Sequence, residues 1–391
     1  MTDRQQRAAA VVFAVHGAVA GSLATRVPWL QDHLGIDTQV LGFALLCPPI
    51  GAFLAMPMAG RLAHRFGGRA ATRGLLALWC AALALPALMP GPFWLGVVFL
   101  LYGAAAGMCD VAMNAQGVVV EKRLGRSIMS GLHGMWSVGN LIGAGTGALA
   151  AQISLDARAH LALVAGALLL AGAAGSRGLP EGRPDSGEPA PGRFQLPPPA
   201  VLAIALVGFC ATFAEWAGIS WAAVYLEQVT GATAGLAAGG YAVFVSCMVA
   251  ARLTGDRLVR RFGPVATVRA SAVTAVAGGL VIAAGRSPAP VIAGFALLGL
   301  GLATIVPLVF AAAGRVSATA GQGVAGVATI TYLSGLLSPP VIGWLAHTFA
   351  FPVAFGLVTC VLAAVPAMAG TLRPRPRVRQ VSEMQVDVKI A

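Results

Sequence analysis

Long apolar stretches, each followed by a short polar segment, repeat along almost the whole chain. An α-helix needs about 20 apolar residues to cross a hydrocarbon layer about 30 Å thick, and the stretches have this length. The pattern therefore predicts an all-α integral membrane protein with twelve transmembrane helices, at 8–30, 38–60, 70–89, 92–118, 127–151, 159–175, 199–226, 234–257, 266–285, 289–313, 320–346 and 351–371.

The two halves of the chain resemble each other. The segment RLAHRFG at 61–67 recurs 196 residues later as RLVRRFG at 257–263, and the same offset aligns Gly35 with Gly231 and Gly103 with Gly299. Between the halves lies a segment rich in Pro, Gly and charge, as in a linker. We expect two six-helix bundles at 1–175 and 199–371, related by a pseudo-two-fold axis along the membrane normal. A cytoplasmic linker at 176–198 joins them, and a basic cytoplasmic tail follows at 372–391.

The composition agrees with this architecture. The chain is 58% hydrophobic and 10% charged, with a mean hydropathy of +0.80, whereas soluble domains carry about 25% charged residues. With both termini in the cytoplasm, 22 of the 26 Lys and Arg fall on the cytoplasmic side. This positive-inside distribution predicts a multi-pass protein of the bacterial inner membrane. It also assigns the net charge of +12 to topology and lipid contact rather than to nucleic acid.

Two acidic residues, Asp110 and Glu215, fall well inside predicted spans, whereas the other acids lie in loops, tails or helix ends. A charged group at the bilayer centre costs at least about 2.5–3.5 kcal/mol on insertion scales, so it is rarely kept without a function. A carboxyl group removed from water favours its neutral form, which suits it to bind and release protons. We therefore take Asp110 and Glu215 as candidate proton-coupling residues.

On span four, Gly103, Gly107, Asp110 and Asn114 share one helical face. The glycines allow close approach of a neighbouring helix, while Asp110 and Asn114 offer a carboxylate and an amide to the bundle interior. We expect Asn114 to contact substrate. The alternative is an interhelical hydrogen bond that only holds the bundle together, worth about 1 kcal/mol.

Span five repeats the pattern with His133, Ser137 and Asn140, and Trp136 lies beside this stripe. Because an imidazole titrates near neutral pH, His133 is a third proton-coupling candidate. Trp136 and Asn140 are candidate substrate contacts. His133 can equally lie near the cytoplasmic end of its span and simply be solvated.

Span one carries Ser22 and Arg26, one helical turn apart. The guanidinium of Arg26 stays charged, so it cannot carry protons. It can bind an anionic substrate, pair with an acid such as Asp110, or extend to the outer surface. We place Ser22 and Arg26 among the candidate substrate-binding residues.

On span seven, Glu215 lies near mid-depth beside Trp216, and we expect it to stand nearly alone among aromatic residues. The pair suits a mixed role, with Glu215 contributing to both proton coupling and substrate binding and Trp216 stacking on the solute. Tryptophans in spans are also common as packing residues and interfacial anchors.

The basic turns after spans two and eight are candidate gating elements. Arg252 and Asp256 are four residues apart near the inner end of span eight, and we expect them to pair with each other and with the cytoplasmic loops rather than with substrate. The full set of gating candidates is Arg61, His64, Arg65, Arg252, Asp256, Arg257 and Arg261.

Twelve spans, the central linker and the repeated basic turn resemble the major facilitator superfamily over essentially the whole chain. Three segments are similar to its YbjJ-like bacterial branch, which is loosely related to fucose permease: Ser22-x-x-x-Arg26-x-Pro28, DVAMNAQG at 110–117, and GDRL at 255–258. Two features differ from many members. His64 stands where the turn after span two usually has an Asp, and span four lacks the common Arg.

The sequence contains no nucleotide-binding loop, nucleophile elbow or metal-spaced His/Cys cluster, so we expect neither an enzyme nor a cofactor or metal site. The resemblance implies a secondary active transporter that works by alternating access. The polar residues inside the spans favour a small polar or anionic organic solute and coupling to protons, and we expect a monomer. A proton-antiport efflux pump for a metabolite or drug is the alternative within transport. A membrane sensor or assembly partner that does not transport is the alternative of another class.

Overall fold

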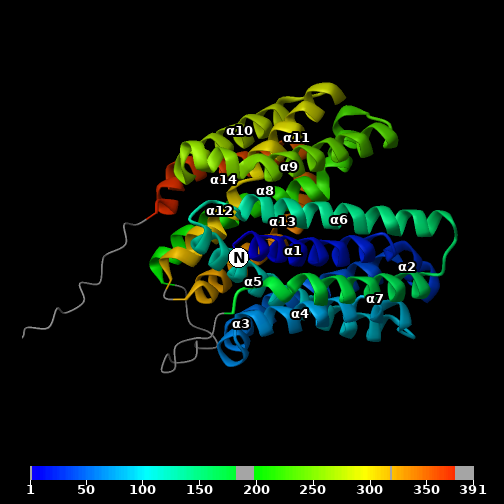
Figure 1. Ribbon diagram of the computed structural model, residues 1–391. Helices are drawn as coiled ribbons and strands as arrows, with labels where there is room; N and C mark the ends of the chain where they lie inside the picture. Colours follow the sequence, from blue (N-terminus) through cyan, green and yellow to red (C-terminus); the bar gives the residue numbers. More distant parts are fainter. Residues whose placement is uncertain (1, 182–197, 318, 375–391) are drawn as a thin grey trace, which may run out of the picture.

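The computed structural model describes residues 2–181, 198–317 and 319–374, and the regular structure within these ranges is entirely helical (Figure 1). The predicted linker is described only at its two ends, and the predicted tail only at 372–374. We call α1–α7 with η1 and η2 the N-terminal half, and α8–α15 with η3 the C-terminal half.

The N-terminal half contains seven α-helices and two short 3-10 helices among the described residues. Their bounds are α1 Thr2–Ala24, α2 Val27–Leu34, α3 Thr38–Phe66, α4 Gly68–Ala82, η1 Leu85–Leu88, α5 Pro92–Leu124, α6 Met129–Gln152, α7 Ala157–Gly175 and η2 Ser176–Gly178.

The C-terminal half contains eight α-helices and one short 3-10 helix among the described residues. Their bounds are α8 Pro199–Thr230, α9 Ala234–Phe262, α10 Pro264–Ala284, α11 Pro288–Leu302, α12 Ile305–Val316, α13 Ala320–Thr348, α14 Phe351–Ala363, α15 Val365–Met368 and η3 Ala369–Leu372.

Eleven helical segments in the described part are long and apolar enough to cross a membrane. The predicted fifth span corresponds to α6, which is 24 residues long but is not one of the eleven. Six glycines, His133 and Asn140 lower its hydropathy. Because α6 packs along α1 in the middle of the bundle, it needs less apolar surface than a helix facing lipid (Figure 1).

Three predicted spans end too early. The structure continues them to Phe66 in α3, Leu124 in α5 and Phe262 in α9, each more than one turn beyond the last apolar run. Hydropathy indicates where lipid contact ends, whereas the helical backbone continues until a residue that breaks it. In α5 that residue is Gly125, whose φ of 65° forms the C-cap.

The repeated basic turn has the same backbone in both halves. Gly67 and Gly263, at its last position, have φ of 83° and 79° and directly precede α4 and α10. Gly35 and Gly231, aligned by the same offset, also have positive φ, at 58° and 67°. A left-handed backbone is costly for a residue with a Cβ, so the glycines permit matching turns in the two halves.

Helix packing repeats in the same way. A Cβ built on Gly103 of α5 would overlap the carbonyl oxygen of Pro48 on α3, and one on Gly299 of α11 would overlap that of Phe244 on α9. Pro48 and Phe244 are themselves related by the 196-residue offset. Corresponding glycines thus bring corresponding helix pairs into backbone contact in the two halves.

We call the end of the bundle that carries the turns at 66–68, 124–129 and 262–264 the basic end, and the opposite end the far end; they lie at the left and right of Figure 1. The two halves separate toward the far end. Gly131 and Gly134 of α6 contact Asp256 and Leu253 of α9. Farther along α6, Leu141 on the same helical face is 65% exposed.

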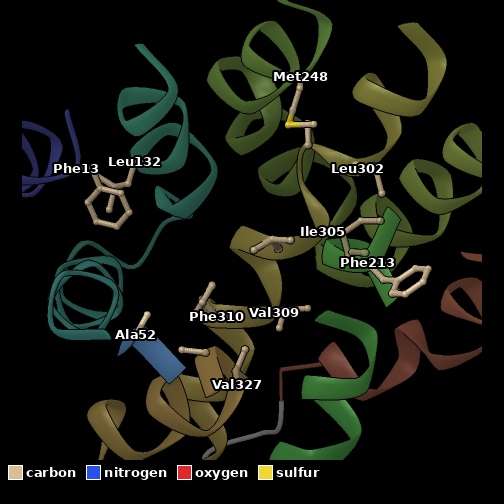
Figure 2. Close-up of a cluster of buried hydrophobic side chains, with 14 of the residues drawn as sticks. Phe13, Ala52, Leu132, Phe213, Met248, Leu302, Ile305, Val309, Phe310 and Val327 are labelled. Carbon is tan, nitrogen blue, oxygen red and sulfur yellow. The ribbon is translucent and has the colours of Figure 1, made fainter. Parts of the chain in front are cut away.

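The core between the halves is apolar at the basic end. Residues 305–314 of α12 are all buried, and Figure 2 shows Ile305 and Phe310 between side chains of both halves. Phe13, Ala52 and Leu132 approach from the N-terminal half, and Met248, Leu302 and Phe213 from the C-terminal half. α12 therefore packs between the two halves as an apolar wedge and contacts both of them.

We predict that Gly139→Ala destabilises the protein. A Cβ at Gly139 of α6 would overlap the backbone of Ala14 on α1, and such overpacking costs about 1–3 kcal/mol. Gly145→Ala on the same helix is the matched control, because nothing lies within 4 Å of its Cβ position. Thermal unfolding in detergent should show a clear loss for Gly139→Ala only. Equal unfolding temperatures for the two variants would contradict the close α1–α6 packing.

Candidate functional site

Asp110 and Asn114 of α5 begin a line of polar contacts in the middle of the bundle. The Asn114 amide nitrogen donates to Oδ1 of Asp110 at 3.2 Å and to the Asp110 carbonyl at 2.9 Å. Its amide oxygen lies 3.1 Å from Nε2 of His133 on α6. Because the amide donates toward Asp110, its oxygen accepts from His133, so His133 carries its proton on Nε2. The polar faces predicted for spans four and five therefore meet.

His133 lies between aromatic rings from both halves. Its ring centroid is 5.5 Å from that of Phe13 on α1 and 5.8 Å from that of Phe310 on α12. This enclosed position excludes the alternative that His133 is solvated at the end of its span. The C-terminal half contributes Tyr332 of α13 near Asp110.

Arg252 of α9 joins the two halves. Its Nη1 donates to the Ser137 hydroxyl on α6 at 3.0 Å, and its Nη2 donates to Oε1 of Glu215 on α8 at 2.8 Å. The Ser137 hydroxyl donates in turn to the His133 carbonyl at 3.1 Å. The arginine and glutamate side chains are 6% and 15% exposed, so the ion pair is well shielded from water.

Together these contacts connect the two acids of the sequence analysis across the interface between the halves. The line runs through Asp110, Asn114, His133, Ser137, Arg252 and Glu215. One step passes through the His133 backbone, so the line is a structural connection rather than an unbroken proton path.

Glu215 therefore has a charged partner, contrary to the expectation that it stands nearly alone among aromatic residues. Its partner Arg252 comes from α9, a different helix with no sequence pattern relating the two residues. The neighbouring Trp216 is 42% exposed, and a Cβ on Gly335 of α13 would lie 2.7 Å from its indole nitrogen. Trp216 thus leans on α13 and leaves part of its ring accessible.

The expected pairing of Arg252 with Asp256 is wrong. The Asp256 carboxylate instead accepts hydrogen bonds from the N-terminus of α6: from the Ser127 hydroxyl at 2.9 Å, the Ser130 amide at 3.2 Å and the Gly131 amide at 2.8 Å. Free N–H groups and the helix dipole make a helix N-terminus attractive to a carboxylate. These amides bind the Asp256 carboxylate across the interface, and Arg252 pairs with Glu215 instead.

A second acid, Glu121 of α5, also accepts hydrogen bonds from amides at the N-terminus of α6. Its Oε2 accepts from the amides of Ile128 and Met129 at 3.0 and 3.1 Å, and its Oε1 accepts from Arg315 of α12 at 3.2 Å. Four consecutive amides of α6 are thus divided between one acid from each half. We call this arrangement the α6 clamp.

Glu121 and Arg315 were not among the candidates from the sequence, because both lie just outside the predicted spans that end at 118 and 313. The available signal was an acid at 121 within a basic segment, eight residues before the start of the next helix. Lys122 and Arg260 add two further bonds between the halves, to the carbonyls of Gly314 at 2.5 Å and of Ser127 at 3.2 Å.

The other gating candidates occupy the basic turns. Arg65 and Arg261, at equivalent positions of the repeat, lie over the rings of Phe66 and Phe262 at 5.3 Å each. Arg61 and His64 are half-buried at the end of α3, and Arg257 is exposed.

Arg26 lies near the far end, between α1 and α2, and does not pair with Asp110. Its Nε donates to Nδ1 of His160 at 3.2 Å, and its Nη2 donates to the Leu155 carbonyl at 3.2 Å. Ser22 donates within its own helix, to the Ala18 carbonyl at 2.7 Å. The structure thus does not bring these two residues together with the central line.

Trp136 forms a separate cluster with α1. Its indole nitrogen donates to Nδ1 of His16 at 3.0 Å, and His16 stacks on Trp79 of α4 at 5.2 Å between ring centroids. The backbone of Asn140 packs against Gly17 and Gly21 of α1.

Among the described residues, no group of three or more His, Cys, Asp or Glu side chains lies close enough together to hold a metal ion.

Comparisons with known proteins agree with this fold. A family model described as the Major Facilitator Superfamily matches residues 9–316. A Yersinia pestis protein named as an uncharacterized MFS-type transporter is 35% identical over 367 residues, covering 93% of this chain and 95% of its own length. An uncharacterized transporter of Sinorhizobium fredii is 32% identical over 370 residues, covering 94% and 98%.

Solved structures show the same architecture at low sequence identity. FucP in its outward conformation gives a TM-score of 0.80 at 18% identity, over 95% of this chain and 99% of that one. The human organic anion transporter MFSD10 gives 0.75 at 16% identity, over 94% and 99%. These two likenesses concern the fold.

We predict that the two members of the Arg252–Glu215 pair are unequal in their effect on stability. Removing one partner of a buried ion pair costs about 3–5 kcal/mol. Glu215→Gln should cost more than Arg252→Gln, because Glu215 can become neutral by taking up a proton and a guanidinium cannot lose one. Thermal unfolding of both variants at pH 7.5 measures this difference.

The double variant Arg252→Gln/Glu215→Gln completes the cycle and should recover much of the loss, because no buried charge remains unpaired. Additive losses in the double variant would contradict a direct interaction between the two side chains.

Proposed function

This chain belongs to the major facilitator superfamily of transporters, and we propose that it moves a small polar or anionic organic solute across the bacterial inner membrane together with protons. Family membership supports transport without a nucleotide-hydrolysing site. The polarity of the solute and the coupling to protons are inferred from the side chains at the centre of the bundle.

One observation carries this proposal: the polar line from Asp110 to Glu215 crosses from one half to the other. Within a membrane, such groups are costly and usually mark ion or substrate pathways. The bond of this line that crosses between the halves joins Arg252 to Ser137, and the same guanidinium holds Glu215, so a change in charge at Glu215 acts on the group that makes the crossing bond. Protonation and the relative position of the halves are thereby linked.

We propose that transport occurs by alternating access, in which the units 1–175 and 199–371 rock about this central line. The α6 clamp, α12 and the neighbouring bonds close the basic end, while the helices diverge at the far end. By the positive-inside rule the basic end faces the cytoplasm, so this arrangement corresponds to a site open to the outside. The gating role belongs to the α6 clamp and the basic turns.

The two acids serve different parts of the cycle. Asp110 is half-buried in the N-terminal half, and its contacts to Asn114 leave its second oxygen for a proton. We assign it the principal coupling role. Glu215 is held by a permanent cation, so a proton on Glu215 changes the charge balance at the interface. An efflux pump would use the same residues with the opposite direction of coupling.

We predict that Asp110→Asn and Glu215→Gln uncouple transport from protons. Proteoliposomes that contain a pH-sensitive dye are exposed to sugars, organic acids and amino acids, and solute-driven proton movement identifies substrates. Either variant should reduce that proton movement at least about tenfold, since a neutral amide cannot carry a proton.

Asp37→Asn is the control for this assay, because Asp37 only caps its own helix α3 at the far end. Solute-driven proton flux that is unchanged in both Asp110→Asn and Glu215→Gln would refute the proposed carriers. The sign of the flux distinguishes symport from antiport.

We also predict that Asp256→Asn weakens closure of the basic end. The variant loses the carboxylate at the N-terminus of α6, which is worth about 1 kcal/mol, or roughly a fivefold shift in a conformational equilibrium. Spin labels are placed at Leu149 of α6 and Leu236 of α9, which are both exposed toward the far end. The fraction of molecules with a shorter distance between the two labels should then increase.

Asp156→Asn is the matched control for the spin-label experiment, since Asp156 caps its own helix, α7, and the charge that it acts on, Arg26, lies in the same half. The native cysteines are replaced in both proteins before labelling. An identical distance distribution in Asp256→Asn and Asp156→Asn would show that the α6 clamp does not hold the closed state.

A further inference from the structure

Arg252 has more hydrogen-bonding capacity than its two partners use. A guanidinium carries five N–H donors, and in this structure two of its nitrogens contact Ser137 and Glu215. The third nitrogen, Nε, is buried and has no hydrogen-bond partner among the described residues. The side chain is thus a buried, permanently charged donor group that is only partly satisfied.

Arg252 also lies at the boundary between the closed and the diverging parts of the interface. Of the hydrogen bonds between the halves described above, its bond to Ser137 is the farthest from the basic end. Just beyond Ser137, Leu141 and Ile142 of α6 are 65% and 59% exposed. On α9, Ser246 is exposed as well. A solute that enters from the far end would therefore meet the Arg252–Glu215 pair before the closed segment.

We propose that Arg252 binds the carboxylate of the transported solute and that Glu215 is the internal competitor for the same guanidinium. This inference rests on the proposed transport function and specifies the substrate class as an organic carboxylate. When Glu215 takes up a proton from water, it becomes neutral and releases Arg252. The carboxylate of the solute then forms the ion pair in its place.

The charge balance of this exchange explains why proton and solute would move together. Before the exchange the site holds one cation and one carboxylate. Afterwards it holds the same cation, the carboxylate of the solute and a neutral Glu215. The net charge at the site is zero in both states, whereas binding the solute without a proton would leave a buried negative charge. Uncompensated charge away from water is strongly unfavourable.

Among the salt bridges of the described residues, the partner of Arg252 is Glu215. Around α8, the packed helices α11, α14, α15 and η3 contain no Asp, Glu, Lys, Arg or His. α12 offers Arg315, which is bonded to Glu121. α13 offers His347 toward the far end and Tyr332, which lies near Asp110.

On α9 itself, Asp256 is engaged by the N-terminus of α6. His133 of α6 is close enough to interact with the charge of Arg252, and its Nε2 is bonded to Asn114. Glu215 is accordingly the side chain that neutralises Arg252. Arg26, a candidate anion anchor from the sequence, contacts His160 and Leu155 and lies away from this site.

Thermal unfolding of the purified protein in nanodiscs tests the inference with three matched pairs of probes. Glucuronate is compared with glucose, lactate with propane-1,2-diol, and succinate with butane-1,4-diol, at constant ionic strength and at pH 5.5 and 7.5. We expect at least one carboxylate to raise the unfolding temperature, more at pH 5.5 than at pH 7.5, while its neutral counterpart has no effect.

Variants then distinguish the role of Arg252 from that of Glu215. Glu215→Gln leaves Arg252 without its competitor, so the carboxylate should stabilise this variant equally at both pH values. At pH 7.5 its half-maximal concentration should fall at least about tenfold relative to the unmodified chain. Arg252→Gln should lose the response, and Arg252→Lys should weaken it because the planar fork is missing. Arg286→Gln, an exposed arginine of a far-end loop, controls for general charge effects.

The inference is overturned if no carboxylate stabilises Glu215→Gln, if the neutral probes act equally, or if Arg252→Gln and Arg252→Lys respond like the unmodified chain. Retained pH dependence in Glu215→Gln would also overturn it. Because binding needs no transport, its failure is distinguishable from that of the proposed function. Proton-coupled uptake of a neutral solute would leave the function standing, and carboxylate binding without uptake would leave the Arg252 site standing.

Discussion

A guanidinium that cannot lose its charge lies between the two halves of this protein, and its need for compensation shapes the site. Arg252 of α9 takes its counter-charge from Glu215 on α8 and a hydroxyl acceptor from Ser137 on α6. Removal of charge from water is the largest local cost in the membrane, so these three helices are tied together at one depth. The remaining polar side chains, from Ser137 through His133 to Asp110, are arranged around that point.

The closed end depends on a related constraint, the four free amides that begin every α-helix. In α6 they are shared between Glu121 of its own half and Asp256 of the other half. The helix N-terminus therefore serves as a joint between the two bundles, reinforced by the apolar wedge of α12 (Figure 2). Closure made by carboxylates on a helix end can be reversed without disturbing the packing inside either half.

Close helix packing lets these contacts form with so few polar groups. Gly103 and Gly107 of α5 lie against the backbone of α3, and Gly139 and Gly143 of α6 lie against that of α1. Each half is thus a tight bundle that can move as a unit. The repeated geometry at Gly67 and Gly263, and at Gly103 and Gly299, indicates that the two halves arose from one six-helix pattern.

The sequence by itself determined the order and approximate positions of the long helices, the duplication, the family and the two unusual acids, because hydropathy and repeated motifs are local along the chain. It also placed Asp110, Asn114 and His133 on faces that meet. Three features were decided by the tertiary structure alone: the pairing of Arg252 with Glu215, the engagement of Asp256 by α6, and the separation of Arg26 from Asp110. Spacing along one helix shows which residues share a face, but which opposite charge or free amide lies across from that face depends on how distant helices pack.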